Sequence, residues 1–130
     1  MENVVYLDTH VIVWLYSGNL DLIPLPIQSI LNKSILLISP FVKLELEYLY
    51  EIKRIKQKSN KIISILKSEI GLNICDIEFT SIIEKAITTK WTRDPFDRII
   101  VAQASLKKST LVTKDETILK NYKNAIWSVK

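Results

Sequence analysis

The sequence contains only one cysteine, Cys75, and one histidine, His10, among its 130 residues. A single cysteine excludes a disulfide within the chain and a zinc site built from several cysteines. No apolar run approaches the ~20 residues that a helix needs to cross a membrane. The first residues, Met-Glu-Asn-Val-Val, lack the basic and apolar regions of a signal peptide. We therefore expect a cytoplasmic protein without a membrane-spanning helix.

Glycine is also scarce, with only Gly18 and Gly71 in the chain. The Gly-x-Gly-x-x-Gly and Gly-Lys-Ser/Thr loops that cradle phosphates are absent, which argues against a nucleotide-binding fold. No Gly-, Ser- or Pro-rich stretch suggests a linker, and 48% of the residues are hydrophobic. We therefore expect one globular domain over residues 1–130.

Short apolar stretches alternate along the chain with longer amphipathic ones. Strands are predicted at residues 3–7, 35–38, 72–75, 110–112 and 125–128. Helices are predicted after the first strand through residue 14, and at residues 40–52, 56–67, 78–88 and 95–108. Ser39 and Asp94 each precede a proline and predict N-caps. Thr113 and Glu116 have the spacing of a capping box, which predicts a last helix to about residue 122. This alternation predicts an α/β fold, with a mainly parallel sheet covered by helices on both faces.

Four carboxylates are predicted at one edge of this sheet. Asp8 directly follows the first strand, and Asp115 comes just after the strand at 110–112. The helices that carry Glu45 and Asp97 begin near the same edge. Because ligand sites of parallel sheets lie at the carboxyl ends of the strands, we expect these four acids to converge.

Helical periodicity places two of these acids on buried faces. Glu45 falls within an apolar stripe, whose members are Phe41, Leu44, Tyr48, Leu49 and Ile52. Asp97 stands one turn before Ile100 and Val101, on the side expected to face the core. A buried carboxylate is unfavourable unless it is paired or bound to a metal.

Each acid also has a structural interpretation. Asp8 and Asp94 fit N-caps, and Asp97 and Asp115 fit first turns that the helix dipole stabilises. Glu45 fits a buried ion pair with one of the 18 cations. That all four acids are predicted at one edge favours a cluster. Carboxylates without histidine or cysteine partners prefer Mg²⁺ or Mn²⁺, which suits phosphodiester hydrolysis by a metal-activated water.

The chain has an excess of basic residues, 18 Lys and Arg against 14 Asp and Glu, which favours a polyanionic partner. Residues 53–67 contain no acid and six cations, Lys53, Arg54, Lys56, Lys58, Lys61 and Lys67. This segment fits either a track for a nucleic-acid backbone or a solvated helix face. The three tryptophans, Trp14, Trp91 and Trp127, fit core positions better than base-stacking platforms, and His10 fits a structural role better than a general base.

Several motifs, in order along nearly the whole chain, resemble those of PIN-domain proteins, and most of all the VapC-type toxins of bacterial toxin–antitoxin pairs. They are Leu7-Asp8-Thr9-His10, Ser39 with Glu45, Asp94-Pro95-Phe96-Asp97-Arg98 before Ala102-Gln103-Ala104, and Leu111-Val112-Thr113-Lys114-Asp115. The resemblance implies an α/β/α sandwich that binds Mg²⁺ or Mn²⁺ and cuts RNA. It also implies a cognate antitoxin that blocks the site, and toxin homodimers.

Carried over residue by residue, the resemblance assigns catalytic and metal-binding roles to Asp8, Glu45, Asp97 and Asp115. Supporting or substrate-binding roles fall to Thr9, Asp94, Arg98 and Thr113. The chain departs from the family pattern at 91–93, where many relatives have a histidine, and at Ser109, which replaces the usual small residue.

Two other functions remain open at this point. A non-catalytic PIN-like module that binds a partner or RNA would be expected to lack one of the acids, and none is missing. An Asp-dependent phosphotransfer domain would need a second acid beside its acceptor aspartate, and Asp8-Thr9-His10 lacks one.

Overall fold

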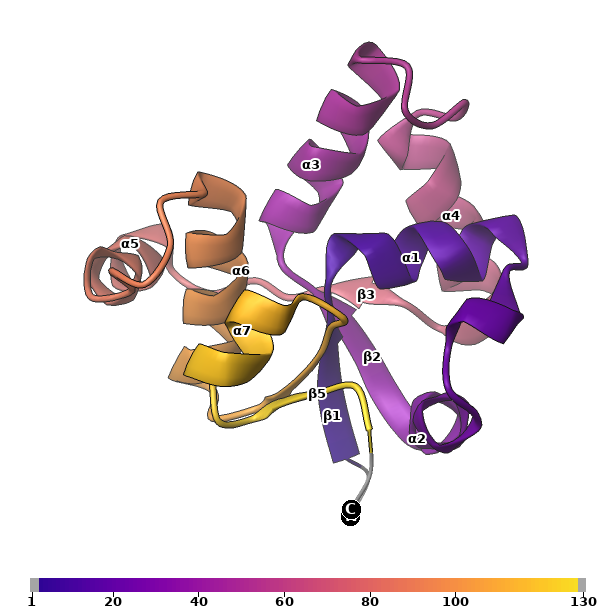
Figure 1. Ribbon diagram of the computed structural model, residues 1–130. Coiled ribbons are helices and arrows are strands. Elements are labelled where there is room, and N and C mark those ends of the chain that lie inside the picture. The colour runs from indigo at the N-terminus through magenta and orange to yellow at the C-terminus, as the bar shows by residue number, and fades with distance from the viewer. Residues whose placement is uncertain (1–2, 129–130) are drawn as a thin grey trace.

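The computed structural model describes residues 3–128, which form one five-stranded sheet with helices on both faces (Figure 1). The strands are β1 (Asn3–Leu7), β2 (Ser34–Ile38), β3 (Asn73–Ile74), β4 (Thr110–Val112) and β5 (Ala125–Ile126). Their order in the sheet is β3-β2-β1-β4-β5, and all four pairings are parallel. The predicted α/β/α sandwich is therefore confirmed. The expectation of one domain stays a prediction, and residues 1, 2, 129 and 130 lie outside the described range.

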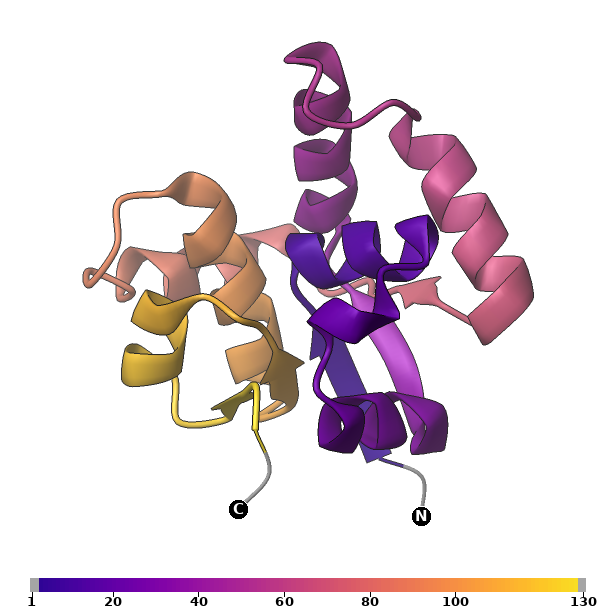
Figure 2. The ribbon, with the colours of Figure 1, turned by 45° about the vertical axis from the view of Figure 1, so that its right-hand side comes forward.

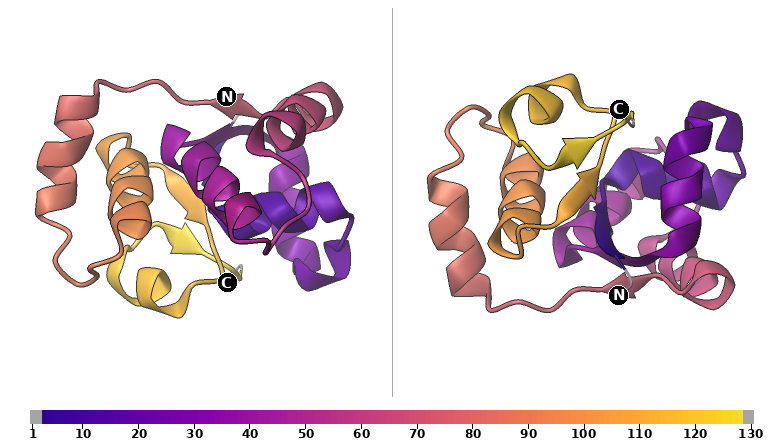
Figure 3. Two further views of the ribbon diagram at one scale, coloured as in Figure 1. Left: turned by 90° about the horizontal axis from the view of Figure 1, so that it is seen from above. Right: turned by 90° about the horizontal axis from the view of Figure 1, so that it is seen from below.

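The sheet forms the middle one of three layers, and helices form the two outer layers. They are α1 (Thr9–Ser17), α2 (Leu25–Lys33), α3 (Pro40–Glu51), α4 (Ser59–Ile70), α5 (Phe79–Ile87), α6 (Pro95–Leu106) and α7 (Glu116–Asn121), with a 3₁₀ turn at Leu20–Leu22. Helices α1, α2 and α4 lie on one face and α5, α6 and α7 on the other (Figures 1 and 2). Helix α3 rises beyond the carboxyl ends of the strands (Figure 1). In the view from above it lies near the middle of the molecule (Figure 3, left). Within the described range, no helix is both long and apolar enough to span a membrane.

The core lies between the central strands and the helices on either side. Its fully buried side chains include Tyr6 and Leu7 of β1, Ile12 of α1, Leu46 of α3 and Ile100 of α6. Gly18 and Gly71, the only glycines, end α1 and α4 in the left-handed conformation, with φ angles of 73° and 71°. Glycine adopts this conformation without the steric penalty that a Cβ brings, so both helices can stop there.

Helix α2 was not predicted. Two prolines, Pro24 and Pro26, make its start resemble a loop in sequence. In the structure Pro24 is the N-cap and Pro26 lies in the first turn, where a missing N–H is tolerated. Ile27 and Leu31, one turn apart, then bury the helix against the core.

Several predicted boundaries were also wrong. Helix α1 continues to Ser17 rather than ending at residue 14. Helix α4 covers Ser59–Ile70 rather than 56–67, because the N–H and hydroxyl of Ser59 both donate to Glu47 of α3 and fix the helix start there. Strand β3 is limited to two residues, and β5 ends at Ile126, before Trp127.

The stripe predicted for α3 was wrong as well. Val42 and Leu46 are the buried residues of α3, whereas Leu44, Tyr48 and Ile52 are exposed. Glu45, which was expected on a buried face, lies beside the buried pair and is half-buried.

Candidate active site

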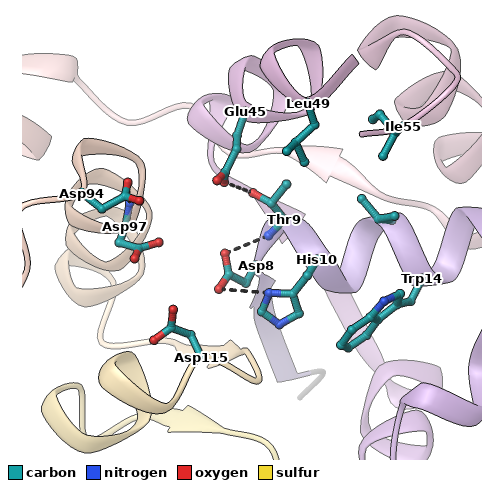
Figure 4. A pocket seen from close by; sticks show the side chains of 11 residues that line it. Asp8, Thr9, His10, Trp14, Glu45, Leu49, Ile55, Asp94, Asp97 and Asp115 are labelled. Carbon is teal, nitrogen blue, oxygen red and sulfur yellow. Dashed lines mark hydrogen bonds and ion pairs between the residues drawn. The ribbon is translucent and has the colours of Figure 1, made fainter. Parts of the chain in front are cut away.

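A pocket opens at the carboxyl ends of the central strands, with a volume of about 360 Å³ (Figure 4). It is lined by Asp8, Thr9, His10, Val13, Trp14, Glu45, Leu49, Ile55, Asp94, Asp97 and Asp115. The four acids predicted to converge thus come from the end of β1, from α3, from the start of α6 and from the loop after β4. The topology brings them together because β1 and β4 are neighbours at the centre of the sheet.

Asp8 is the most buried of these acids, with 4% of its surface exposed. It caps the start of α1, where its Oδ1 accepts the N–H of Thr9 at 2.8 Å. Its Oδ2 accepts the hydroxyl of Thr113 at 2.7 Å. The structural N-cap interpretation and the pocket position are therefore both correct for this residue.

Thr113 lies behind Asp8 and outside the pocket lining. Its side-chain oxygen accepts the N–H of Asp115 at 3.0 Å while its hydroxyl donates to Asp8. The predicted capping box of Thr113 with Glu116 is therefore wrong. Asp115 is the N-cap of α7 instead, and its Oδ1 accepts the N–H of Ile118 at 3.0 Å.

Glu45 points from α3 into the pocket and accepts a hydrogen bond from the hydroxyl of Thr9 (Figure 4). Burial raises the pKa of Glu45, and the negative charges of Asp8 and Asp94 raise it further. The hydrogen bond from Thr9 opposes this shift, because it stabilises the ionised carboxylate.

Asp97 has the most perturbed carboxylate of the site. Burial is the main cause that raises its pKa to about 7, and the charges of Asp8, Asp94, Asp115 and Glu45 add to the shift. At neutral pH this group is therefore poised between its two protonation states. Repulsion among these carboxylates is what a bound cation would relieve.

Asp94 caps α6, as its position before a proline predicts. Its Oδ1 accepts the N–H groups of Phe96 at 2.8 Å and of Asp97 at 3.2 Å. Arg98 does not line the pocket; its Nε donates to the carbonyl of Thr92 at 2.8 Å and ties down the segment before α6.

His10 connects two parts of the pocket wall. Its Nε2 accepts the N–H of Lys114 at 2.8 Å, so a neutral ring carries its hydrogen on Nδ1, which lies 3.7 Å from Oδ2 of Asp8. Burial lowers the pKa of His10, although the charges of Asp8 and Asp115 act in the opposite direction. This geometry agrees with a structural role.

Sequence reasoning missed the apolar side of the pocket. Trp14, half-buried in α1, lines the pocket and also packs on the core. Val13, Leu49 and Ile55 extend the same surface. Helical spacing on α1, which brings residues 10, 13 and 14 to one side, is the signal that could have revealed it.

The oxygen donors of the pocket suit a hard divalent cation in chemistry. Over residues 3–128, however, no three side chains of the His, Cys, Asp and Glu types are already close enough together to hold an ion. Because like charges repel, a cation would draw these carboxylates together.

The PIN domain family model matches residues 5–124. The chain belongs to the PIN domain family. This match covers most of the chain and confirms the resemblance drawn from the motifs. No curated protein sequence is similar enough to count as a relative.

Several solved structures share the fold of this PIN domain, among them the following two. One is a toxin–antitoxin complex from Klebsiella pneumoniae, with a TM-score of 0.63 and 18% identity over 94% of this chain and 95% of that chain. The other is VapBC2 from Rickettsia felis bound to a DNA fragment from its promoter, with a TM-score of 0.64 and 19% identity over 95% of this chain and 96% of that chain.

Proposed function

We propose that this PIN domain protein is a metal-dependent endoribonuclease that hydrolyses RNA phosphodiester bonds. The observation that carries the proposal is the gathering of Asp8, Glu45, Asp97 and Asp115 in one open pocket. Carboxylates that raise one another's pKa are unfavourable for folding on their own, and they are frequent at functional sites.

Asp8, Glu45, Asp97 and Asp115 would hold Mg²⁺ or Mn²⁺. The bound ion would supply a water of lowered pKa and neutralise charge on the phosphate. The hydroxyls of Thr9 and Thr113 hold Glu45 and Asp8 in place before any substrate arrives.

Two further residues support the reaction from outside this set of ligands. Asp94 positions Asp97, because its cap fixes the first turn of α6. Arg98 positions the preceding segment through the carbonyl of Thr92. The exposed Lys and Arg side chains of residues 53–67 would attract the phosphates of the RNA backbone electrostatically.

We further propose that the protein is the toxin of a type II toxin–antitoxin pair and acts in the cytoplasm. Support comes from the motifs and from the two structural neighbours, which are described as a toxin–antitoxin complex and as VapBC2. The partner would be a cognate antitoxin that covers the pocket. Co-expression with the neighbouring small reading frame, followed by co-purification, tests this partner.

We also propose a homodimer that forms through the aromatic surface of α3, α5 and α6. Phe41 contacts Phe79 and Phe96, with ring centres 6.4 and 5.7 Å apart, and Tyr48 contacts Phe96 at 6.0 Å. Phe79 is 57% exposed and Tyr48 48% exposed, which is unfavourable for large apolar side chains in a monomer. Light scattering of the wild type and of Phe79→Lys tests this interface.

The ribonuclease proposal is tested by incubating purified protein with single-stranded RNA in Mg²⁺, in Mn²⁺ and in EDTA. Cleavage is expected with either metal and not in EDTA. Asp8→Asn, purified in the same way, is the control for contaminating nucleases and should be inactive. Full cleavage in EDTA would contradict the metal requirement.

Two further measurements on the same purified protein distinguish the alternatives. Metal-independent binding of RNA without cleavage would support a non-catalytic binding module. Transfer of phosphate to the protein from a small phosphodonor would support a phosphotransfer domain, and the acid cluster argues against that outcome.

A further inference from the structure

The active-site pocket has two halves of different chemistry. Asp94, Asp97 and Asp115 lie on one side of Asp8, as Figure 4 shows. The other side is an apolar wall, which consists of Val13, Trp14, Leu49 and Ile55. The acidic half is sufficient to hold a cation and a phosphate. The apolar wall would therefore contact an apolar group of the ligand, next to the phosphate.

Trp14 offers a flat aromatic surface within this wall. Its ring centre lies 5.1 Å from that of His10 and 5.7 Å from that of Trp127, with interplanar angles of 56° and 53°. Both contacts are tilted, so among the described aromatic contacts none stacks flat on the indole. The ammonium of Lys114 lies over the indole, 5.7 Å from the ring centre, on an exposed side chain. A planar ligand group that displaces this side chain can stack on the ring, which is the arrangement that nucleobases adopt on tryptophan.

Cations lie near the apolar wall. One is Lys114, whose exposed side chain would stay close to a ligand that takes its place over Trp14. Ile55 stands between Arg54 and Lys56, both exposed. A group that enters the apolar wall thus has acids on one side, where a cation-bound phosphate would lie, and cations near it for neighbouring phosphates.

We propose that the apolar wall is a nucleobase subsite, in which the base next to the scissile phosphate stacks on Trp14. This inference rests on the proposed ribonuclease function and deepens it. In RNA, a phosphate, a base and the next phosphate follow one another, which matches the acids, the apolar wall and the nearby cations. An apolar side chain of a protein would not interact with these cations. A base can enter only if it is unstacked from its neighbours, so the substrate would be single-stranded or looped RNA.

The test is a thermodynamic cycle on RNA binding. The protein carries Asp97→Asn, so that RNA stays intact in Mg²⁺, and the probes are a labelled short RNA and a set of the same RNAs that each lack one base. At one position, loss of the base should weaken binding about tenfold when Trp14 is present. In Trp14→Leu, which keeps apolar bulk but cannot stack, loss of that base should have no effect. Trp14→Phe should restore part of the difference.

A control separates stacking from general damage to the aromatic cluster. Trp127 touches Trp14 and His10 but does not line the pocket, so Trp127→Phe should keep the position-specific effect. A base-loss effect that is equal in the Trp14 and Trp14→Leu proteins at every position would overturn the proposal. That result would favour binding of an apolar side chain of a protein partner to the apolar wall.

A second measurement does not depend on folding of the leucine variant. With Trp91→Phe and Trp127→Phe, Trp14 is the only tryptophan, and stacking should quench its fluorescence when RNA binds. RNA that lacks the stacking base should bind without quenching, and equal quenching by both RNAs would overturn the subsite.

The two proposals can fail separately. Cleavage by the wild type, together with RNA binding that does not depend on Trp14, would refute the subsite alone. Binding with Trp14-dependent base recognition but no cleavage in any metal would refute the nuclease proposal alone.

Discussion

The hydroxyl of Thr113 donates to Oδ2 of Asp8 at 2.7 Å, and its oxygen accepts the N–H of Asp115 at 3.0 Å. One fully buried side chain therefore connects Asp8 and Asp115, the first and the last of the four proposed metal ligands. Because Asp8 is itself buried, this hydrogen bond both stabilises the fold and fixes the direction of a proposed metal ligand.

Replacement of Thr113 by valine should therefore affect stability and activity together. Valine keeps the shape but removes a hydrogen bond to a buried charged group, which should lower the free energy of unfolding by ~1.5–3 kcal/mol. RNA cleavage should fall as well, since Asp8 and Asp115 lose their common partner. Thr113→Ser keeps the hydroxyl and should stay near the wild type in urea unfolding and in cleavage. Wild-type values for the valine variant in both measurements would refute this coupling.

Metal binding should stabilise the folded protein, because a cation relieves repulsion in the pocket. At a hundredfold excess over Kd the expected gain is about 2.7 kcal/mol. Melting is measured with Mn²⁺ and, as a control for ionic strength, with NaCl. The gain should vanish in Asp8→Asn. A melting temperature that Mn²⁺ does not change would argue against a metal site in this pocket.

The convergence of the acids was predictable because it follows from topology. Asp8 and Asp115 follow strands that a parallel sheet brings to one edge, and local sequence is sufficient to recognise both strands. Asp94 and Ser39 were correctly predicted as N-caps because both precede a proline. The strands and the caps each depend on interactions within a few residues, and the parallel topology then brings the acids together.

The wrong predictions concern features that depend on contacts between residues far apart in the sequence. The hydroxyl of Thr113 bonds to Asp8, 105 positions away, rather than to the helix that follows it. Helix α3 is apolar on more than one side, and periodicity does not tell whether Leu44 or Val42 faces the core. The start of α4 depends on Glu47 of another helix. The apolar wall was missed because Trp14 and Ile55 meet only in the folded chain.

The stability of the metal-free protein should depend on the ionisation of Asp97. Its pKa is raised from 3.8 to about 7 on folding, so the folded state retains a proton that the unfolded state releases. The contribution of Asp97 to stability is therefore greatest at low pH and is lost as the pH rises from about 4 to about 7. Asp97→Asn should match the wild type at pH 4 and exceed it at pH 8 by about 1 kcal/mol, with allowance for solvent screening of a partly exposed group. Urea unfolding in EDTA at both pH values measures this difference, and a constant difference would rule out Asp97 as its source.

Asp94 and Asp97 stand three residues apart at the start of α6, and both line the pocket. The Oδ1 of Asp94 is committed to two N–H groups of the first turn, which makes this residue a cap. The pKa of Asp97 is raised to about 7, mainly by burial and further by the charges of the other acids, which suits a ligand for a cation. Asp97→Asn should therefore lower cleavage by at least ~100-fold, because the loss of an electrostatic contact in the transition state costs about 2.7–4 kcal/mol.

Asp94→Ala should instead lower the free energy of unfolding by ~1 kcal/mol through the lost cap, and should keep most of the cleavage rate. Asp94→Asn is the matched control, since asparagine caps a helix as well as aspartate but is a poorer ligand for a hard cation. Cleavage rates and melting curves for all three variants decide the assignment. An inactive Asp94→Asn beside an active Asp97→Asn would reverse it. Loss of cleavage in both asparagine variants would mean that the two carboxylates share the cation, since the cap alone does not need a charge.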